Sequence, residues 1–154
     1  MKLTAVLALV LPLPALAIGY VAGAASVIDG DTIAIHSGRI RLHGISAPET
    51  SQICMRNQRR YRCGQEAAFA LDDKIGSKVV TCEHRDTDRY GRMVAVCVAG
   101  GIDLGRWLVQ QGHALAYRKY SLDYVRDEDA ARVAKAGLWA GEFQNPAEVR
   151  QPRR

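Results

Sequence analysis

Five charged side chains have types and spacing that suit chemistry at phosphorus. Asp29 and Asp31 are two residues apart at the end of an apolar run, so both carboxylates can face one hard cation. Arg41, Glu49 after a proline, and Arg92 in a Tyr-Gly-Arg turn follow along the chain. A cation and two guanidinium groups stabilise a pentacoordinate phosphate, and a carboxylate accepts a proton from the attacking water. The set therefore indicates hydrolysis of a phosphodiester.

Each of these residues also has an ordinary structural explanation. Asp29 precedes a glycine, and Asp-Gly pairs are common in turns. Arg41 lies on a strand face where arginines are usually solvated, and Glu49 is a loop carboxylate. Only their combination, in this order along the chain, makes the hypothesis specific.

Two predicted β-hairpins and an initial strand would position these side chains. The apolar run 18–28 predicts the first strand, and runs 32–36 and 39–43 flank Ser37-Gly38, a two-residue hairpin connection. Runs 78–83 and 93–98 predict a second hairpin around the loop 86–92. The segment between residues 44 and 61 contains Pro48 and many arginines, and we expect it to be irregular.

Three helices are expected beside these strands. Ala67, Leu71 and Ile75 recur at helical spacing before Gly76, and residues 102–111 and 122–136 form two further candidates. Five strands are too few for a sandwich of two sheets. The sequence therefore predicts an α+β fold that is mainly β, a closed five-stranded barrel with three packed helices.

Composition and charge restrict the function only broadly. The chain has 154 residues, 48% of them hydrophobic, with 21 lysines and arginines against 16 acidic residues and a net charge of +5. These values exclude a disordered, collagen-like or multi-pass membrane protein, and they weakly favour a polyanionic partner. Arginines 56, 59, 60 and 62 could grip a nucleic-acid backbone or simply be solvated.

The N-terminal segment and the cysteines indicate export. Lys2, the apolar run 3–17 and the small residues of Ala15-Leu16-Ala17 predict a signal peptide cleaved after residue 17. The alternative is a membrane anchor over residues 3–25. We expect one domain over residues 18–142, a loose tail over 143–154, and a secreted or periplasmic location.

Four cysteines allow three disulfide connectivities in an oxidising compartment. Cys82 and Cys97 lie on runs that flank a turn, so they can face each other across a hairpin. Cys54 and Cys63 would then close a short loop. The sequence therefore favours these two local pairs as structural disulfides.

Several motifs extend the pattern over most of the chain, from about Val27 to Trp139. They are Val27–Thr32, Arg41-Leu42, Gly44-Ile45, Ala47-Pro48-Glu49, Gln65-Glu66-Ala67, Asp88–Arg92, Leu108–Gly112 and Gly137-Leu138-Trp139. In this order and spacing the chain resembles the thermonuclease family, the staphylococcal nuclease-like domains. The resemblance implies an OB-fold barrel and calcium-dependent cleavage of DNA and RNA at the P–O5′ bond.

The resemblance also implies roles for particular residues. Arg41 and Arg92 match the catalytic arginines, and Glu49 matches the general base. Asp31, Asp29 and the Ala47 carbonyl match the calcium site, whereas Arg89, Tyr90 and Tyr117 match nucleotide contacts. Ser46 replaces an aspartate of that metal site. Calcium would then bind weakly, give way to another hard ion, or bind only with substrate, because affinity follows ligand charge.

Two other classes of function stay open at this point. The first is a non-catalytic OB-fold module that binds nucleic acid or another polyanion, which the loss of a carboxylate at Ser46 favours. The second is a scaffold associated with envelope polysaccharide, because a fold does not fix a function. For the nuclease we expect DNA or RNA as substrate, a monomer, no stable protein partner, and no membrane contact after signal cleavage.

Overall fold

The computed structural model describes residues 19–150. The predicted signal peptide and residues 151–154 lie outside this range. The strands are β1 (Tyr20–Gly23), β2 (Ala25–Asp29), β3 (Thr32–Ile35), β4 (Gly38–Leu42), β5 (Ile45–Ser46), β6 (Cys54–Arg56), β7 (Arg59–Tyr61), β8 (Val80–Thr87), β9 (Met93–Ala99), β10 (Ile102–Asp103), β11 (Leu115–Ala116) and β12 (Gly141–Glu142). The helices are α1 (Cys63–Ile75), α2 (Leu104–Gln110), α3 (Val125–Val133), α4 (Pro146–Val149) and a 3₁₀ turn at Gly137–Ala140.

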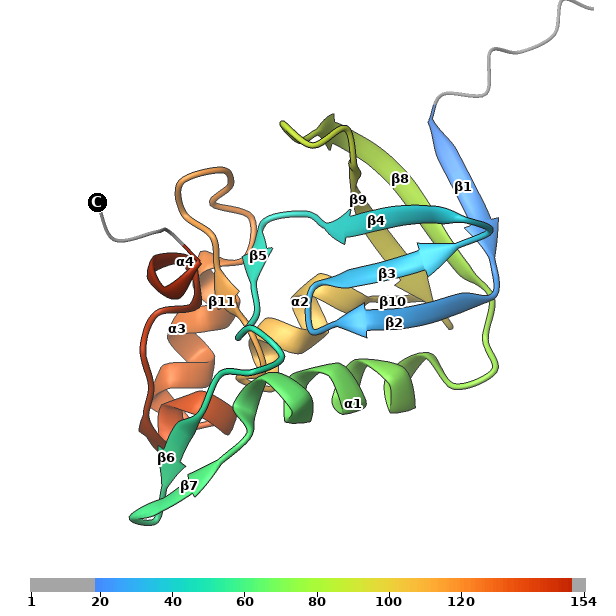
Figure 1. Cartoon of the computed structure of the whole chain (residues 1–154). Coiled ribbons are helices and arrows are strands. Elements are labelled where there is room, and N and C mark those ends of the chain that lie inside the picture. Colours follow the sequence, from blue (N-terminus) through green and yellow to red (C-terminus); the bar gives the residue numbers. More distant parts are fainter. Residues whose placement is uncertain (1–18, 151–154) are drawn as a thin grey trace, which may run out of the picture.

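One large sheet organises the fold (Figure 1). Its strand order is β1-β8-β9-β4-β3-β2, with β10 beside β9. All of these pairs are antiparallel except β4 with β9, which run parallel. This parallel pair joins the two predicted hairpins, so residues far apart in sequence meet there. Two small sheets, β11-β5 and β12-β6-β7, complete the β-structure of the described residues.

The structure confirms a mixed α+β fold but not the closed five-stranded barrel. The strand predicted over residues 18–28 is divided at Ala24, and its halves pair with β8 and β3 at opposite edges of an open sheet. Small residues allow this division. A Cβ atom on Gly23 would lie only 3.0 Å from side-chain atoms of both His36 and Ile35, so the backbone at this bend passes close to both side chains.

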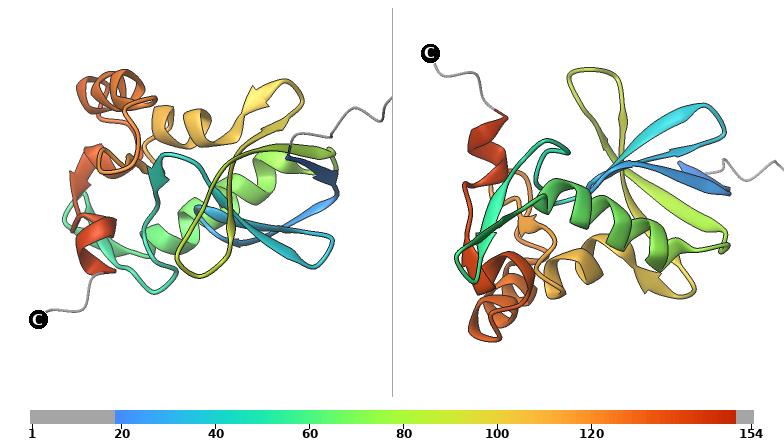
Figure 2. Two further views of the ribbon diagram at one scale, coloured as in Figure 1. Left: turned by 90° about the horizontal axis from the view of Figure 1, so that it is seen from above. Right: turned by 60° about the horizontal axis from the view of Figure 1, so that its bottom comes forward.

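The described residues contain four α-helices rather than the three that were predicted, and the additional one is α4. Helix α1 lies across one face of the sheet, while α3 and α4 gather near the β5–β11 pair (Figure 1; Figure 2). Leu71 of α1 and Leu108 of α2 are completely buried against Ile33 of β3 and its neighbours, which forms the main core. Within residues 19–150, no helix has the length and apolar character that a membrane crossing requires.

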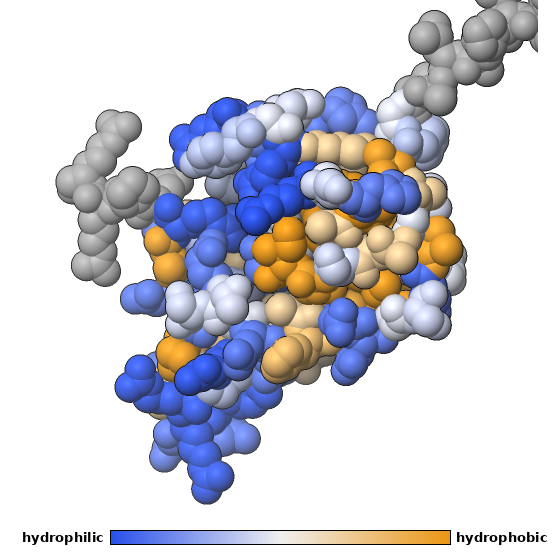
Figure 3. Space-filling model, turned by 45° about the vertical axis from the view of Figure 1, so that its right-hand side comes forward, coloured by the Kyte–Doolittle hydropathy of each residue, from blue (hydrophilic) through white to orange (hydrophobic). Residues whose placement is uncertain are grey.

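The segment expected to be irregular contains three short strands. Asn57 and Gln58 both have positive φ, 51° and 62°, which is the backbone of a tight hairpin turn between β6 and β7. This turn contains no glycine, so it carries no strong local signal for a hairpin. The hairpin forms a hydrophilic projection at the bottom of the molecule (Figure 3). Its exposed arginines, Arg59 and Arg60, extend away from the main core.

Both predicted disulfide pairs are present. Cys82 and Cys97 lie opposite each other on β8 and β9, and both are buried in the main core. Cys54 and Cys63 join β6 to the start of α1. No free cysteine occurs among the described residues. Each disulfide joins two elements that are neighbours along the chain, which is why the sequence could indicate both pairs.

Removal of the core disulfide is expected to destabilise the fold. The pair closes a loop with a sequence separation of 15, and the replacement Cys82→Ala with Cys97→Ala should lower the free energy of unfolding by about 3 kcal/mol. Urea denaturation followed by circular dichroism measures this change. Wild-type protein in reducing buffer is the control, because it should show at least the same loss. An unchanged free energy of unfolding would show that this bridge does not stabilise the fold.

Candidate active site

Asp31 is a buried charged group in the turn between β2 and β3, with an exposed fraction of 1%. Its Oδ1 accepts hydrogen bonds from Thr32 Oγ1 at 3.1 Å and Arg41 Nη1 at 3.3 Å. Its Oδ2 accepts from the Ala47 amide at 3.0 Å and Arg150 Nη2 at 3.2 Å. Burial alone would raise the pKa of Asp31, but the two guanidinium groups and the amide hold it below its ordinary value. Asp31 is therefore a carboxylate at neutral pH.

Asp29 closes the same turn. Its Oδ1 accepts a hydrogen bond from the Asp31 amide at 3.0 Å, so the carboxylate is directed toward the backbone of its own turn. Burial, followed by repulsion from Asp31, raises the pKa of Asp29 above its ordinary value. Gly30, between Asp29 and Asp31, packs closely against Ala47. A Cβ atom on Gly30 would lie 2.7 Å from the Ala47 Cβ. The turn is thereby held against the segment that follows β5.

Arg41 and Arg92 come from different hairpins. Arg41 on β4 donates from Nη1 to Asp31 and from Nη2 to the Ile45 carbonyl at 3.4 Å. In the parallel pairing of β4 with β9, Arg41 stands opposite Val94, two residues beyond Arg92. The pairing therefore places both arginines at one end of the sheet.

Asp88 positions Arg92. Its Oδ1 accepts from the amides of Tyr90 and Arg92, both at 2.9 Å, and its Oδ2 accepts from Arg92 Nε at 2.7 Å. Although partial burial opposes ionisation, the bonds from Arg92 and the Tyr90 amide lower the pKa of Asp88 below its ordinary value. Asp88 lies in one of the motifs noted in the sequence, but its spacing alone does not predict this positioning role. The contact leaves the terminal nitrogens of Arg92 available to a ligand.

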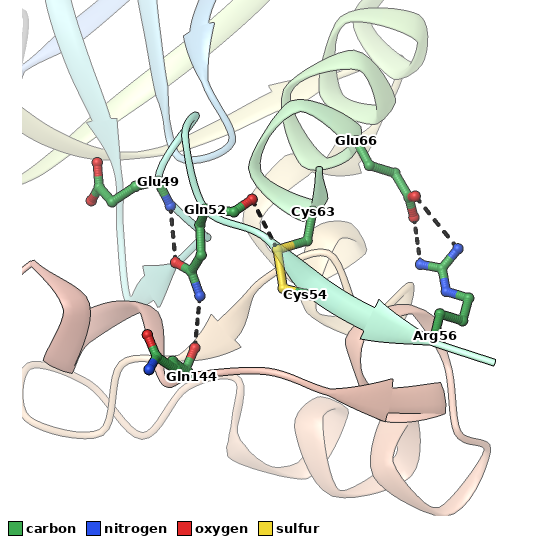
Figure 4. Close-up of a disulfide and its surroundings, with 7 residues drawn as sticks. All are labelled: Glu49, Gln52, Cys54, Arg56, Cys63, Glu66 and Gln144. Carbon is green, nitrogen blue, oxygen red and sulfur yellow. Dashed lines mark hydrogen bonds and ion pairs between the residues drawn. A yellow bond between two sulfur atoms is a disulfide. The ribbon is translucent and has the colours of Figure 1, made fainter. Parts of the chain in front are cut away.

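Glu49 lies in a loop that is fixed from two sides (Figure 4). Gln52 is buried, its Oε1 accepts from the Glu49 amide at 3.3 Å, and its Nε2 donates to the Gln144 carbonyl at 2.8 Å. On the other side, a Cβ on Gly64 would lie 1.7 Å from the Glu49 carbonyl oxygen, so only glycine allows α1 to pack this closely. The backbone of Glu49 is thus fixed, while its carboxylate remains partly exposed.

Arg150, which the sequence analysis placed in a loose tail, contacts the centre of this site. Its Nε donates to Glu49 Oε1, and its Nη2 donates to Asp31 Oδ2 and to the Ala47 carbonyl, both at 3.2 Å. Burial opposes the charge, but Asp31 and Glu49 raise the pKa of Arg150 above its ordinary value. Residues 143–150 are therefore part of the folded domain.

A helix start at the C-terminal end could have revealed this arrangement. Asn145 caps α4 by accepting from the Ala147 amide at 3.0 Å, and Pro146 occupies the first turn. Asparagine followed by proline is a recognised beginning of a helix. Arg150 is the residue that caps the C-terminal end of α4, and its side chain bonds to Asp31.

A groove of about 1130 Å³ runs beside these residues. Six basic residues line it (Arg41, Arg85, Arg89, Arg92, Lys119, Arg150), with three acidic residues (Asp86, Asp88, Glu148) and three tyrosines (Tyr90, Tyr117, Tyr120). The guanidinium groups of Arg89 and Arg92 lie 4.9 and 5.5 Å from the centre of the Tyr90 ring. Tyr117 and Tyr120 pack edge to face at 4.7 Å. Positive charge beside exposed aromatic rings is typical of a surface that binds single-stranded nucleic acid.

The structure divides the predicted site residues into two groups. Arg41, Arg92, Arg89, Tyr90 and Tyr117 line the groove. The expected cation ligands and the expected base, namely Asp29, Asp31, Ser46, Ala47 and Glu49, do not line it. Arg150 and Arg41 connect the two groups, because each lines the groove and also bonds to Asp31.

The sequence model of the family described as staphylococcal nuclease homologue matches residues 39–141. The chain belongs to this family. Its matched region includes both arginines and Glu49, whereas the turn with Asp31 and the segment with Arg150 lie outside it.

Relatives of the chain support the same assignment. A succinoglycan biosynthesis protein, ExoI, of Rhizobium meliloti is 39% identical, with 83% of this chain and 69% of that protein covered. An uncharacterized endonuclease of Haemophilus influenzae is 34% identical, with coverages of 83% and 70%. A probable staphylococcal-like nuclease of Oryza sativa, CAN2, is 31% identical over 80% of this chain and 32% of the plant protein. The names of the second and third relatives support a nuclease in general terms.

The arranged residues do not fit a preformed site for a divalent cation. Both carboxylate oxygens of Asp31 and the carbonyl of Ala47 already accept hydrogen bonds from the protein. Ser46 is buried and its Oγ has no hydrogen-bond partner, but a neutral hydroxyl adds no charge for a cation. Within residues 19–150, no three His, Cys, Asp or Glu side chains cluster as metal ligands.

Proposed function

We propose that this protein is an exported nuclease that hydrolyses phosphodiester bonds of DNA and RNA. The observation that carries the proposal is the convergence of Arg41 and Arg92, from separate hairpins, on one basic and tyrosine-lined groove. Membership of the staphylococcal nuclease homologue family supports hydrolysis of nucleic acid by this groove. The two disulfides favour an oxidising compartment, which is consistent with a secreted or periplasmic location.

We assign Arg41 and Arg92 to binding the phosphate and stabilising its negative charge. Asp31 and Asp88 hold Arg41 and Arg92 through charge-assisted bonds, so both guanidinium groups are oriented before substrate binds. Each can donate paired N–H groups to the non-bridging oxygens, where negative charge increases in the transition state. This preorganisation lowers the barrier because no reorientation is needed during the reaction.

We assign Glu49 as the general base that activates the attacking water. Its carboxylate accepts the proton as the water oxygen bonds to phosphorus. The P–O5′ bond then breaks, which leaves a 3′-phosphate and a 5′-hydroxyl whose oxygen takes a proton from solvent. The loop fixed by Gln52 and Gly64 holds Glu49 in place for this step. The carboxylate must first be released from Arg150, which binds it in the structure.

Nucleotide binding is assigned to the exposed part of the groove. Tyr90 and Tyr117 offer ring faces or edges for bases, and Arg89 lies beside Tyr90 for a neighbouring phosphate. Stacking on aromatic rings tolerates every base, so we expect little sequence preference.

Hydrolysis of single-stranded DNA by the purified, disulfide-bonded protein tests the proposal. The assay uses EDTA in one arm and a Ca²⁺ titration in the other, since calcium remains a prediction from the family resemblance. Cleavage that yields 3′-phosphate ends in either arm would support the nuclease. Binding without cleavage in EDTA, Ca²⁺, Mg²⁺ or Mn²⁺ would instead identify a nucleic-acid-binding module.

A second candidate function follows from one relative. The similarity to a succinoglycan biosynthesis protein favours a role connected with polysaccharide biosynthesis. The basic groove would then bind an acidic polymer rather than a phosphodiester. Fluorescence titration with an acidic polysaccharide and with single-stranded DNA distinguishes the two, because the nuclease should prefer DNA.

Loss of the Asp88 carboxylate is expected to reduce catalysis through Arg92. In Asp88→Asn the ion pair to Arg92 is lost, and kcat/KM should fall by about 10- to 100-fold because the guanidinium is misplaced. The control Asp72→Asn removes the same charge from an exposed position on α1 and should retain activity. Steady-state DNA hydrolysis and a thermal melt measure the effect. Equal activity of the two variants would contradict the positioning role.

A further inference from the structure

The C-terminal segment places a cation of its own inside the site. Arg150 bonds to two carboxylates and one carbonyl, which are the oxygen ligands that a hard divalent cation prefers. We propose that Arg150 is the resident cation of this site and competes with divalent metal ions for the oxygens of Asp31, Ala47 and Glu49.

The geometry makes occupancy by Arg150 and by a metal mutually exclusive. Arg150 Nη2 lies 3.2 Å from both Asp31 Oδ2 and the Ala47 carbonyl oxygen, and Nε reaches Glu49 from the same planar group. A Ca²⁺ ion would need the same oxygens at about 2.3–2.6 Å. The guanidinium group must leave before an ion can approach that closely.

The charge balance favours the guanidinium group. Asp31 and Glu49 together carry two negative charges, and Arg41 and Arg150 carry two positive charges. The charges of these four side chains balance, so Arg150 compensates negative charge that would otherwise attract a divalent cation. Loss of Arg150 would leave an uncompensated negative charge shared by the buried Asp31 and the partly exposed Glu49, which strengthens the attraction of a divalent ion.

The fold holds Arg150 in place but allows it to move. The segment is anchored at Gln144 by Gln52 and begins α4 with the Asn145 cap, whereas α4 itself has only four residues. Arg150 lines the groove, whereas Asp31 and Glu49 do not line it and are bonded to Arg150. Displacement of this one side chain would therefore open both carboxylates to the groove without unfolding the domain.

Calcium binding without nucleic acid tests the competition independently of hydrolysis. Isothermal calorimetry would compare the wild-type chain with Arg150→Gln and with Arg126→Gln, which removes the same charge from an exposed position on α3. We expect Arg150→Gln to bind Ca²⁺ at least tenfold more tightly than wild type, and Arg126→Gln to match wild type. Equal affinities in all three proteins, or no binding by Arg150→Gln, would overturn the proposal. An equal gain in Arg126→Gln would attribute the effect to net charge alone and would also overturn it.

Nuclear magnetic resonance can follow the displacement directly. The Nε–H signal of Arg150, assigned by its loss in Arg150→Gln, should be protected from solvent exchange in the metal-free wild type. Addition of enough Ca²⁺ to saturate the protein should shift this signal and increase its exchange. A bound metal that leaves the Arg150 signal unchanged would show that both cations fit together, and the proposal would be wrong. Circular dichroism of each variant verifies that the fold is retained.

Discussion

Replacement of Arg41 or Arg92 by alanine is expected to reduce kcat/KM for DNA hydrolysis by about 10³-fold, while the fold is retained. Each guanidinium group is aligned on the groove by a carboxylate, Asp31 for Arg41 and Asp88 for Arg92. Loss of one preorganised donor to the transition state costs about 10²–10³ in rate, and an arginine that meets charge on a phosphoryl group contributes about 10³ or more. Single-turnover hydrolysis measures the chemical step.

The two positions differ in their structural consequences. Arg41 pairs with a completely buried carboxylate, so Arg41→Ala should also lower the melting temperature, whereas Arg92→Ala should have little effect on it. Arg41→Lys keeps a positive charge beside Asp31 but loses the planar pair of donors, and it should restore stability without restoring the rate. Arg39→Ala, at an exposed position of the same strand, is the control. Full activity of either alanine variant would remove that arginine from the catalytic assignment.

Glu49→Gln is expected to slow the chemical step by about 10²–10⁴-fold, because the amide cannot accept the proton of the attacking water. Affinity for single-stranded DNA should change little, since Glu49 does not line the groove that binds the polymer. Single-turnover rates and equilibrium binding, measured on the same protein, separate the two effects.

A matched substitution tests whether the effect is specific to Glu49. Glu142→Gln changes an exposed glutamate on β12 and is the matched control. An unchanged single-turnover rate in Glu49→Gln would show that another group activates the water.

Much of the fold depends on local patterns, which the sequence reveals directly. Ser37-Gly38 fixed the first hairpin, the spacing of Ala67, Leu71 and Ile75 fixed α1, and the position of Cys82 and Cys97 around a turn fixed their pairing. The residues that define each hairpin, helix or disulfide lie within about fifteen positions of one another. These features can therefore be predicted without knowledge of long-range contacts. The family resemblance rested on motifs of the same kind.

The boundaries of the sheet were less predictable. An apolar run over residues 18–28 has the composition of one strand, yet Ala24 divides it between two partners at opposite edges. Strand pairing depends on the neighbours that the complete fold supplies, and a single strand does not specify them. The same reason explains the extra strands in the segment 44–61.

The sequence by itself determined the chemistry available to this protein: two arginines, a turn with two aspartates, a loop glutamate and two disulfides. Only the tertiary structure decided how that chemistry is arranged. The parallel pairing of β4 with β9 brings Arg41 and Arg92 to one groove, and α4 places Arg150 on Asp31 across 119 positions of sequence. Contacts of such separation leave no local pattern, because they form only when the whole core has packed and the surrounding oxygens have lost their water.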